Sequence, residues 1–242
     1  MRSLGSVDLG AYARAFVLLA RNPQIVLAPL LAALANVLLF MLMPSSNGGG
    51  FIGSINSGLS GLFAQLITGF GMGVALIVAD AAWRRGRAPF DEAWDEARRK
   101  AGDILIAALG FSFVIYVAAL IGSFIPFGSI VLALVALYFF VYTLPAAAIG
   151  GIPGGAAIQV SLERARGAVL ATLLITALYL FANFVAPTLI LLALAPLYAV
   201  TPALATGVGA SLISAAITAL ITAYVALVLA KTYADVSFTR RW

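Results

Sequence analysis

Few side chains in this sequence are of the types that usually carry out catalysis. Histidine and cysteine are both absent from its 242 residues. Their absence removes the commonest general base, the commonest metal ligand and the thiolate nucleophile. The remaining side chains form no nucleophile–base arrangement and no metal-ligand spacing. We therefore predict a protein that is not an enzyme, with no catalytic residue, no metal site and no cofactor.

The chemistry that remains is binding, and its first candidates are polar side chains within long apolar runs. The interiors of these runs contain no Asp, Glu, Lys or Arg, which argues against a proton relay, a voltage sensor or a carboxylate site for cations. Asn183, together with Tyr179, Asn36 and Gln65, could line a cavity for a lipid or a small neutral solute. The alternative is that these groups hydrogen-bond between helices, or that the tyrosine lies in an interfacial belt.

A second set of candidates is charged and lies where two apolar runs end. Asp80 and Asp235 are each followed by arginines four to six residues further on, among them Arg84 and Arg240. These four side chains could form a cytoplasmic gate or a docking site for a partner. The alternative is an ion pair at the end of a helix, where basic side chains favour the negative end of the helix dipole.

The elements that must position these side chains are transmembrane helices. Hydrophobic residues make up 63% of the chain and charged residues 10%, whereas soluble domains have about 25% charged residues. Six apolar runs reach the roughly 20 residues that a helix needs to cross a bilayer. They are Gln24–Met43, Ile55–Ala79, Ile104–Phe124, Phe127–Ile149, Ala168–Ala195 and Val208–Ala230. The predicted fold class is all-α, a polytopic membrane protein of one domain with six transmembrane helices arranged as three hairpins.

The basic residues predict the orientation of these helices. With six spans, every Lys and Arg falls on one side of the membrane, and the loop Asp80–Asp103 alone holds twelve of the 23 charged side chains. The positive-inside rule then predicts cytoplasmic N- and C-termini in the cytoplasmic (inner) membrane. The net charge of +5 is explained by this topology and by attraction to anionic membrane lipids, so we expect no nucleic-acid partner.

An amphipathic segment precedes each pair of spans. The clearest begins after Pro89 and places Phe90 and Trp94 on one apolar face at helical spacing. Weaker copies are Leu9–Arg21 and Ala156–Gly167. We predict that these segments are interfacial helices, with Phe90 and Trp94 as membrane anchors. The C-terminal Trp242 is predicted to be a further interfacial anchor.

The three amphipathic segments also indicate an internal repeat. Each forms a unit with the two spans that follow it, so the chain divides into pseudo-repeats at about 1–80, 81–150 and 151–242. The first and third units end alike, because Asp80 and Asp235 each follow an alanine and precede a pair of arginines. The middle unit ends instead in a glycine-rich turn.

The sequence from Leu144 to Leu174, LPAAAIGGIPGGAAIQVSLERARGAVLATLL, resembles a known group of proteins. These are six-helix prokaryotic integral membrane proteins similar to the membrane domain of some glycerophosphodiester phosphodiesterases. Pro145, Gly154, Ser161, Arg164 and Arg166 occupy matching places. The group often has an acidic residue after the fourth span, where this chain has Gly150 and Gly151. The resemblance implies fold and topology but no phosphodiesterase activity.

Two functions are consistent with these features. The first is transport or binding of a lipid or small neutral solute, at a site near Asn183 that opens to one side of the membrane. The second is a membrane scaffold or accessory subunit, in which the loop Asp80–Asp103 and the basic tail dock a cytoplasmic partner, a membrane protein or a second copy of the chain. We favour the first.

Overall fold

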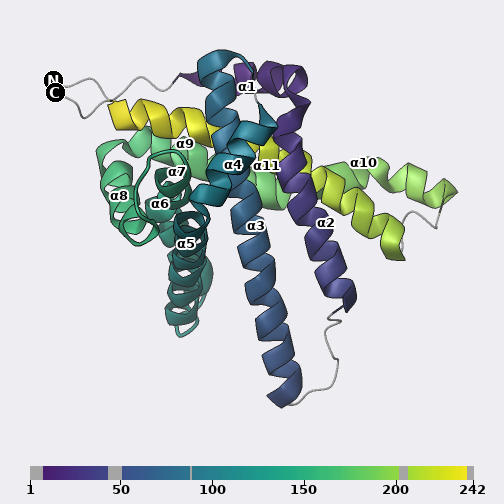
Figure 1. Cartoon of the computed structure of the whole chain (residues 1–242). Coiled ribbons are helices and arrows are strands. Elements are labelled where there is room, and N and C mark those ends of the chain that lie inside the picture. The colour runs from purple at the N-terminus through teal and green to yellow at the C-terminus, as the bar shows by residue number, and fades with distance from the viewer. Residues whose placement is uncertain (1–7, 43–50, 88, 202–206, 239–242) are drawn as a thin grey trace.

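The computed structural model describes residues 8–42, 51–87, 89–201 and 207–238, and every regular element in them is helical. In chain order these are α1 (Leu9–Arg21), η1 (Pro23–Val26), α2 (Leu27–Leu42), α3 (Phe51–Arg85), α4 (Phe90–Arg99), α5 (Ala101–Gly122), α6 (Gly128–Phe140), α7 (Thr143–Ala148), α8 (Gly154–Gly167), α9 (Val169–Leu180), η2 (Phe181–Val185), α10 (Ala186–Val200) and α11 (Gly207–Phe238). Figure 1 shows these helices diverging from one common region.

Six helices in the described residues are long and apolar enough to cross a membrane, as predicted. They are Pro23–Leu42, Leu59–Arg85, Ala101–Gly122, Gly128–Ala148, Val169–Pro196 and Gly207–Ser237. The fourth of these combines α6 with α7, and the fifth combines α9, η2 and most of α10. The chain is therefore an all-α protein whose helices suit a multi-pass membrane protein.

Two helices extend further than the apolar runs that predict them. The helix α3 continues past Asp80 to Arg85, and α11 continues past Asp235 to Phe238. No glycine or proline interrupts either continuation, and the next glycine after α3, Gly86, has a φ of 70° that an ordinary residue rarely adopts. The two aspartates therefore lie inside helices rather than at their ends.

The fourth span is broken where α6 meets α7, and a proline explains the break. Pro145 has no N–H to donate, and its ring clashes with the carbonyl of Val141, four residues earlier. Tyr142 then donates its backbone N–H to Ser161 Oγ of α8 at 3.0 Å, and that hydroxyl donates to the Phe139 carbonyl at 2.9 Å. Ser161 therefore supplies the hydrogen bonds that the interrupted helix lacks.

The fifth span contains a turn of π-helix, η2, which a second proline explains. Pro187 lies just beyond it and would clash with the carbonyl of Asn183 in a regular α-helix. In the wider turn, Ala186 N–H donates to the Phe181 carbonyl, five residues earlier. The Nδ2 group of Asn183 donates to the Tyr179 carbonyl at 2.8 Å. The side chain of Asn183 thus helps to satisfy the backbone at this irregular turn.

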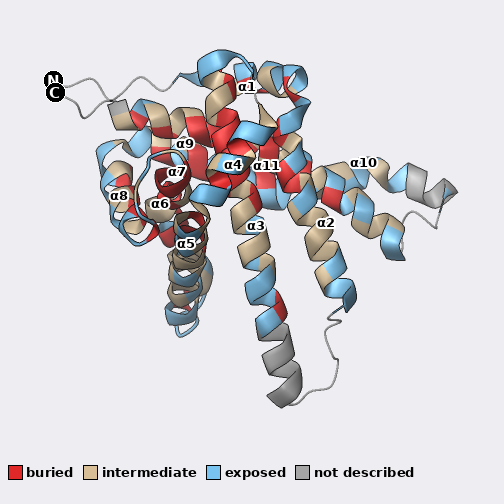
Figure 2. Cartoon of the chain, in the orientation of Figure 1, coloured by how far each residue is buried: buried red, intermediate tan, exposed pale blue. Residues whose placement is uncertain are grey.

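Burial is concentrated at one end of the spans, the end that carries Arg21, Arg84, Lys100, Arg164 and Lys231, here called the charged end. Residues 73–79 of α3 and 225–230 of α11 are buried there, whereas Phe63 and Leu212, further along the same two helices, are exposed. Figure 2 shows this contrast between a buried common region and exposed helix arms. The core of the protein therefore lies toward the charged end, and the opposite, uncharged end is loosely packed.

Small residues allow the spans to approach closely within this core. A Cβ atom at Gly69 would lie 2.3 Å from the Cβ of Ala108 in α5, and one at Gly71 would lie 2.5 Å from the Cβ of Ala32 in α2. The helix α3 therefore packs between α2 and α5 on glycines that alternate in direction. Such contacts supply the van der Waals packing that holds helices together in lipid.

The pairing of neighbouring spans is uneven. The helix α2 packs along α3, and α5 packs along α6. The helix α11 packs against α2 and α3 more extensively than against α10, and Trp83 of α3 donates its indole N–H to the Leu227 carbonyl of α11 at 2.8 Å. The last span thus lies beside the first two, a contact between segments far apart in the sequence.

Candidate functional site

Two of the polar side chains proposed to line a cavity make hydrogen bonds between helices. Asn36 Nδ2 of α2 donates to Thr68 Oγ1 of α3 at 2.9 Å. Ser112 Oγ of α5 donates to Gln65 Oε1 of α3 at 3.2 Å. These contacts agree with the alternative to a ligand cavity, in which polar groups hydrogen-bond between neighbouring transmembrane helices.

The other two, Asn183 and Tyr179, are not brought together with Asn36 and Gln65. They are joined to each other within the fifth span by the bond from the Asn183 side chain to the Tyr179 carbonyl. Among the described residues, no hydrogen bond joins this pair to Asn36 or Gln65. Asn36 and Gln65 are thus bonded to α3 and α5, whereas Asn183 is bonded to Tyr179 within the fifth span.

Replacing Asn183 with alanine is expected to have a modest effect on stability. Loss of its bond to the Tyr179 carbonyl should lower the free energy of unfolding by about 1 kcal/mol, and the Tm in detergent by roughly 2–4 °C. Because Asn183 is bonded inside its own helix, the amount of lipid that copurifies should not change. Loss of bound lipid at an unchanged Tm would favour the original interpretation of Asn183 as a binding residue.

The two aspartates among the charged candidates each form an ion pair within their own helix. Arg84 donates to both carboxylate oxygens of Asp80, at 3.1 Å from Nε and at 2.7 Å from Nη2. Asp235 pairs with Lys231, one turn before it, at 2.6 Å. Asp80 thus pairs with a basic residue that follows it in α3, whereas Asp235 pairs with a basic residue that precedes it in α11. The two pairs differ in this way although the sequences around the two aspartates are similar. Arg240 and Trp242 lie outside the described residues.

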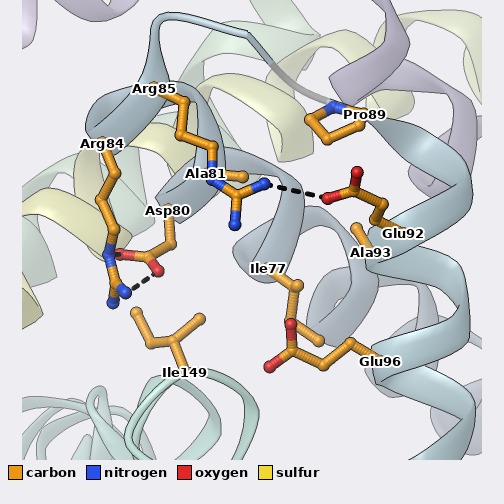
Figure 3. Close-up of a pocket in the computed structure, with 10 residues that line it drawn as sticks. All are labelled: Ile77, Asp80, Ala81, Arg84, Arg85, Pro89, Glu92, Ala93, Glu96 and Ile149. Atoms are coloured by element: carbon orange, nitrogen blue, oxygen red, sulfur yellow. Dashed lines mark hydrogen bonds and ion pairs between the residues drawn. The ribbon is translucent and has the colours of Figure 1, made fainter.

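A cavity with a volume of about 140 Å³ lies beside the first pair, between the end of α3 and α4. Its lining residues are Ile77, Asp80, Ala81, Arg84, Arg85, Pro89, Glu92, Ala93, Glu96 and Ile149. Figure 3 shows Arg85 reaching across to Glu92, which it contacts at 2.9 Å. The cavity therefore has basic and acidic groups on facing elements, with apolar side chains beside them.

The acidic wall of this cavity belongs to α4, whose residues differ in burial. Ala93 and Ala97 are buried, whereas Asp91 and Asp95 are exposed. Glu96 forms an ion pair with Lys100, at the end of this helix, at 2.6 Å. Lys100 also donates to the Ala148 carbonyl at 3.1 Å, so the end of α4 is attached to α7.

Phe90 and Trp94, the predicted membrane anchors, make aromatic contacts within the protein. The Trp94 ring packs edge-on against Phe70 of α3, with 5.6 Å between ring centroids. It also stacks on Phe90 at 5.8 Å. Both side chains are partly buried against the core. These contacts fix α4 on α3 and leave part of each ring exposed.

Several side chains that hold the charged end together are not apparent from the sequence pattern. Asp103 Oδ1 accepts a hydrogen bond from the backbone N–H of Gly154, at the start of α8. Arg164 donates to the carbonyls of Val236 and Ser237 at the end of α11, at 3.3 and 3.4 Å. Each of these bonds joins a charged side chain to a helix terminus of the complementary dipole. The sequence shows the charged side chains and predicts where the helices end. It does not show that Asp103 meets the start of α8 or that Arg164 meets the end of α11.

Comparison of the chain with protein-family models, with curated proteins and with solved structures finds no match. The resemblance to membrane domains of glycerophosphodiester phosphodiesterases therefore stays a prediction. The fold and the charge distribution define only a class of protein. In the described part of the chain, six helices are able to cross a membrane and the charged residues gather at one end of them.

Proposed function

We propose that this chain is a multi-pass protein of the cytoplasmic membrane that binds or transports a lipid, without enzymatic activity. The observation that supports it best is the apolar exposed surface of the spans beyond the core. Large side chains are exposed there on different helices, among them Leu38, Phe63, Phe113, Ile130 and Phe184. Because these helices diverge toward the uncharged end (Figure 1), acyl chains are the groups best suited to cover them in a bilayer.

A lipid suits this surface better than a polar solute does. A hydrophilic solute would need several unpaired donors or acceptors at one place. One polar atom of each of Asn36, Gln65 and Asn183 is instead bonded within the protein. Among the described atoms of these three side chains, Asn36 Oδ1 is a buried acceptor without a partner, and one acceptor is fewer than such a solute needs. We therefore narrow the predicted ligand to a lipid.

The proposed orientation places the charged end in the cytoplasm, with both termini there. The basic residues near the span ends support it by the positive-inside rule. In this orientation α1, α4 and α8 lie at the cytoplasmic interface as amphipathic helices. The exposed tip of the α5–α6 turn, with Phe124 and Phe127, then lies at the opposite interface, where aromatic side chains favour the headgroup region.

The order of helix contacts supports the three proposed pseudo-repeats. The amphipathic helix of each unit contacts the second span of the unit before it: α4 contacts α3, α8 contacts α7, and α1 closes the circle by contacting α11. The first spans follow the same order, since α5 contacts α3, α9 contacts α6 and α2 contacts α11. Three units that repeat one set of neighbours fit a pseudo-threefold arrangement around α3, α7 and α11.

The alternative function is a scaffold that docks a partner through the loop Asp80–Asp103. Asp91, Asp95 and Arg99 are exposed on α4, and such side chains suit a charged partner surface. Other charges of the loop are engaged within the protein, because Asp80, Glu92 and Glu96 each pair with a basic side chain. These internal pairs reduce the charge that the loop presents to a partner.

Native mass spectrometry of the protein extracted in a mild detergent tests the proposal. We expect a defined lipid bound at fixed stoichiometry. Replacing Phe113, on the exposed arm of α5, with serine should lower retained lipid about fivefold, the equivalent of ~1 kcal/mol for one apolar contact. Replacing Asp91, a polar residue exposed on α4, with serine serves as the control and should retain the lipid.

Two outcomes would contradict lipid binding. One is recovery of a second protein, or of copies of this chain alone, without lipid. The other is equal lipid loss in both variants, because that would show general detergent extraction rather than a site on the spans. A recovered partner that is lost when residues 90–100 are deleted would establish the scaffold instead.

A further inference from the structure

We propose that the cavity between α3 and α4 binds a lipid headgroup that carries both a phosphate ester and a primary ammonium group. The proposal rests on the lipid-binding function above and names the class of lipid. It places the headgroup between Arg85 of α3 and Glu92 of α4. Figure 3 shows these two side chains facing each other across the cavity.

The charges on the two walls favour a zwitterion. Arg85 comes from the last turn of α3, and Glu92 and Glu96 come from successive turns of α4. An anion inserted between Arg85 and Glu92 would pair with the arginine and leave the glutamate facing like charge. A cation would do the reverse. A phosphate beside Arg85 with an ammonium beside Glu92 replaces one ion pair by two, so charge balance is kept.

The existing ion pair can open at little cost. The side chains of Arg85 and Glu92 are 66% and 68% exposed, and an exposed pair contributes only about 0–1 kcal/mol. Arg84 is held differently, because it contacts Asp80 through two hydrogen bonds and the Asp80 side chain is only 16% exposed. The Asp80–Arg84 pair therefore shapes the cavity, while Arg85 and Glu92 are available to a ligand.

Size and position also suit a headgroup. A cavity needs a volume of about 10–15 Å³ to hold one water molecule. The cavity between α3 and α4 has about 140 Å³ and therefore holds a group of several heavy atoms. Ile77 and Ile149 contribute apolar surface to the lining. Ile77 lies two turns before Arg85 on α3, in the direction of the membrane-spanning part of the helix. Charged groups above apolar ones match the order of headgroup and glycerol backbone at a membrane interface.

The test compares lipids on the intact protein in bilayer discs made of equal parts of palmitoyl-oleoyl phosphatidylethanolamine and phosphatidylglycerol. Lipids that remain bound after release into detergent are counted by native mass spectrometry. We expect the ethanolamine lipid to be enriched about tenfold, as one charge-assisted contact of roughly 1.4 kcal/mol gives. The double variant E92Q/E96Q should lose this enrichment and keep the thermal stability of the unmodified protein.

A matched control lies on the same helix. The double variant D91N/D95N removes the same number of negative charges from α4, but neither residue lines the cavity. It should keep the enrichment. The single variants R85Q and R98Q form a second pair, of which only R85Q should reduce retention of the ethanolamine lipid.

Each result then has one meaning. Equal retention of the two lipids by the unmodified protein overturns the headgroup proposal and leaves lipid binding intact. Equal loss in E92Q/E96Q and D91N/D95N also overturns it, because the effect would then follow net charge. Retention of no lipid overturns both proposals. Binding of free phosphoethanolamine by lipid-free protein, abolished by E92Q/E96Q, would support the same chemistry and assign it to a soluble ligand.

Discussion

Replacing Ser161 with alanine is expected to destabilise the protein by about 2–4 kcal/mol, because one buried and one partly buried backbone group lose their partner. The Ser161 side chain is fully buried. Its hydroxyl accepts from the Tyr142 N–H and donates to the Phe139 carbonyl, and both groups lie at the break between α6 and α7. Because Ser161 and Tyr142 are closed to solvent within the protein, bulk water cannot replace the hydroxyl.

Two measurements check this prediction. The Tm of the S161A variant in detergent should fall by about 5–15 °C, at 2–4 °C for each kcal/mol in a chain of this size. Hydrogen exchange of the Tyr142 amide should rise in the same variant. Ser123 gives the matched control, because it is exposed and its hydroxyl donates to the Leu120 carbonyl, within its own chain segment at the end of α5. If S123A lowered the Tm as much as S161A, the proposed role of Ser161 would be wrong.

The break that Ser161 repairs shows what the sequence can predict. Pro145 is visible in the sequence, and a proline in a long apolar run predicts a distorted helix. Ser161 is visible too, as a hydroxyl within an amphipathic segment. Nothing local joins them, because their contact depends on α8 folding back against the fourth span. Length and hydropathy therefore predict six helices, whereas the hydrogen bonds that correct their irregularities depend on tertiary packing.

The candidate sites also show that the sequence does not reveal which side chains on separate helices meet. Asn36, Gln65 and Asn183 were grouped because polar side chains are rare in apolar runs. Each has a different neighbour in the structure, and spacing along separate helices carries no information about which faces meet. Asp80 and Arg84 are four residues apart on one helix, so their ion pair follows from the sequence alone. The cavity beside them does not, because its second wall is supplied by α4.

The second large effect is expected at Gly154, the first residue of α8. A Cβ atom there would lie 2.4 Å from the carbonyl oxygen of Asp103 and 2.9 Å from the Cβ of Ile106. The closer of these atoms belongs to the backbone of α5, so only a shift of one helix could relieve the contact. The shift would also lengthen the 3.0 Å bond from the Gly154 N–H to Asp103 Oδ1. We expect G154A to destabilise the protein by about 2–4 kcal/mol.

Gly155, the next residue, provides a matched control, because its replacement with alanine should not lower the stability of the protein. A Cβ atom at Gly155 would meet nothing within 4 Å, and alanine is favoured over glycine in a helix by up to ~1 kcal/mol. The Tm of G155A should therefore equal or slightly exceed that of the unmodified protein, while that of G154A falls by roughly 5–15 °C. Equal Tm values for the two variants would mean that α8 does not pack on α5 and rests on the lipid surface instead. A difference of the expected sign would mean that this amphipathic helix is part of the packed core, held there by α5 as much as by the membrane.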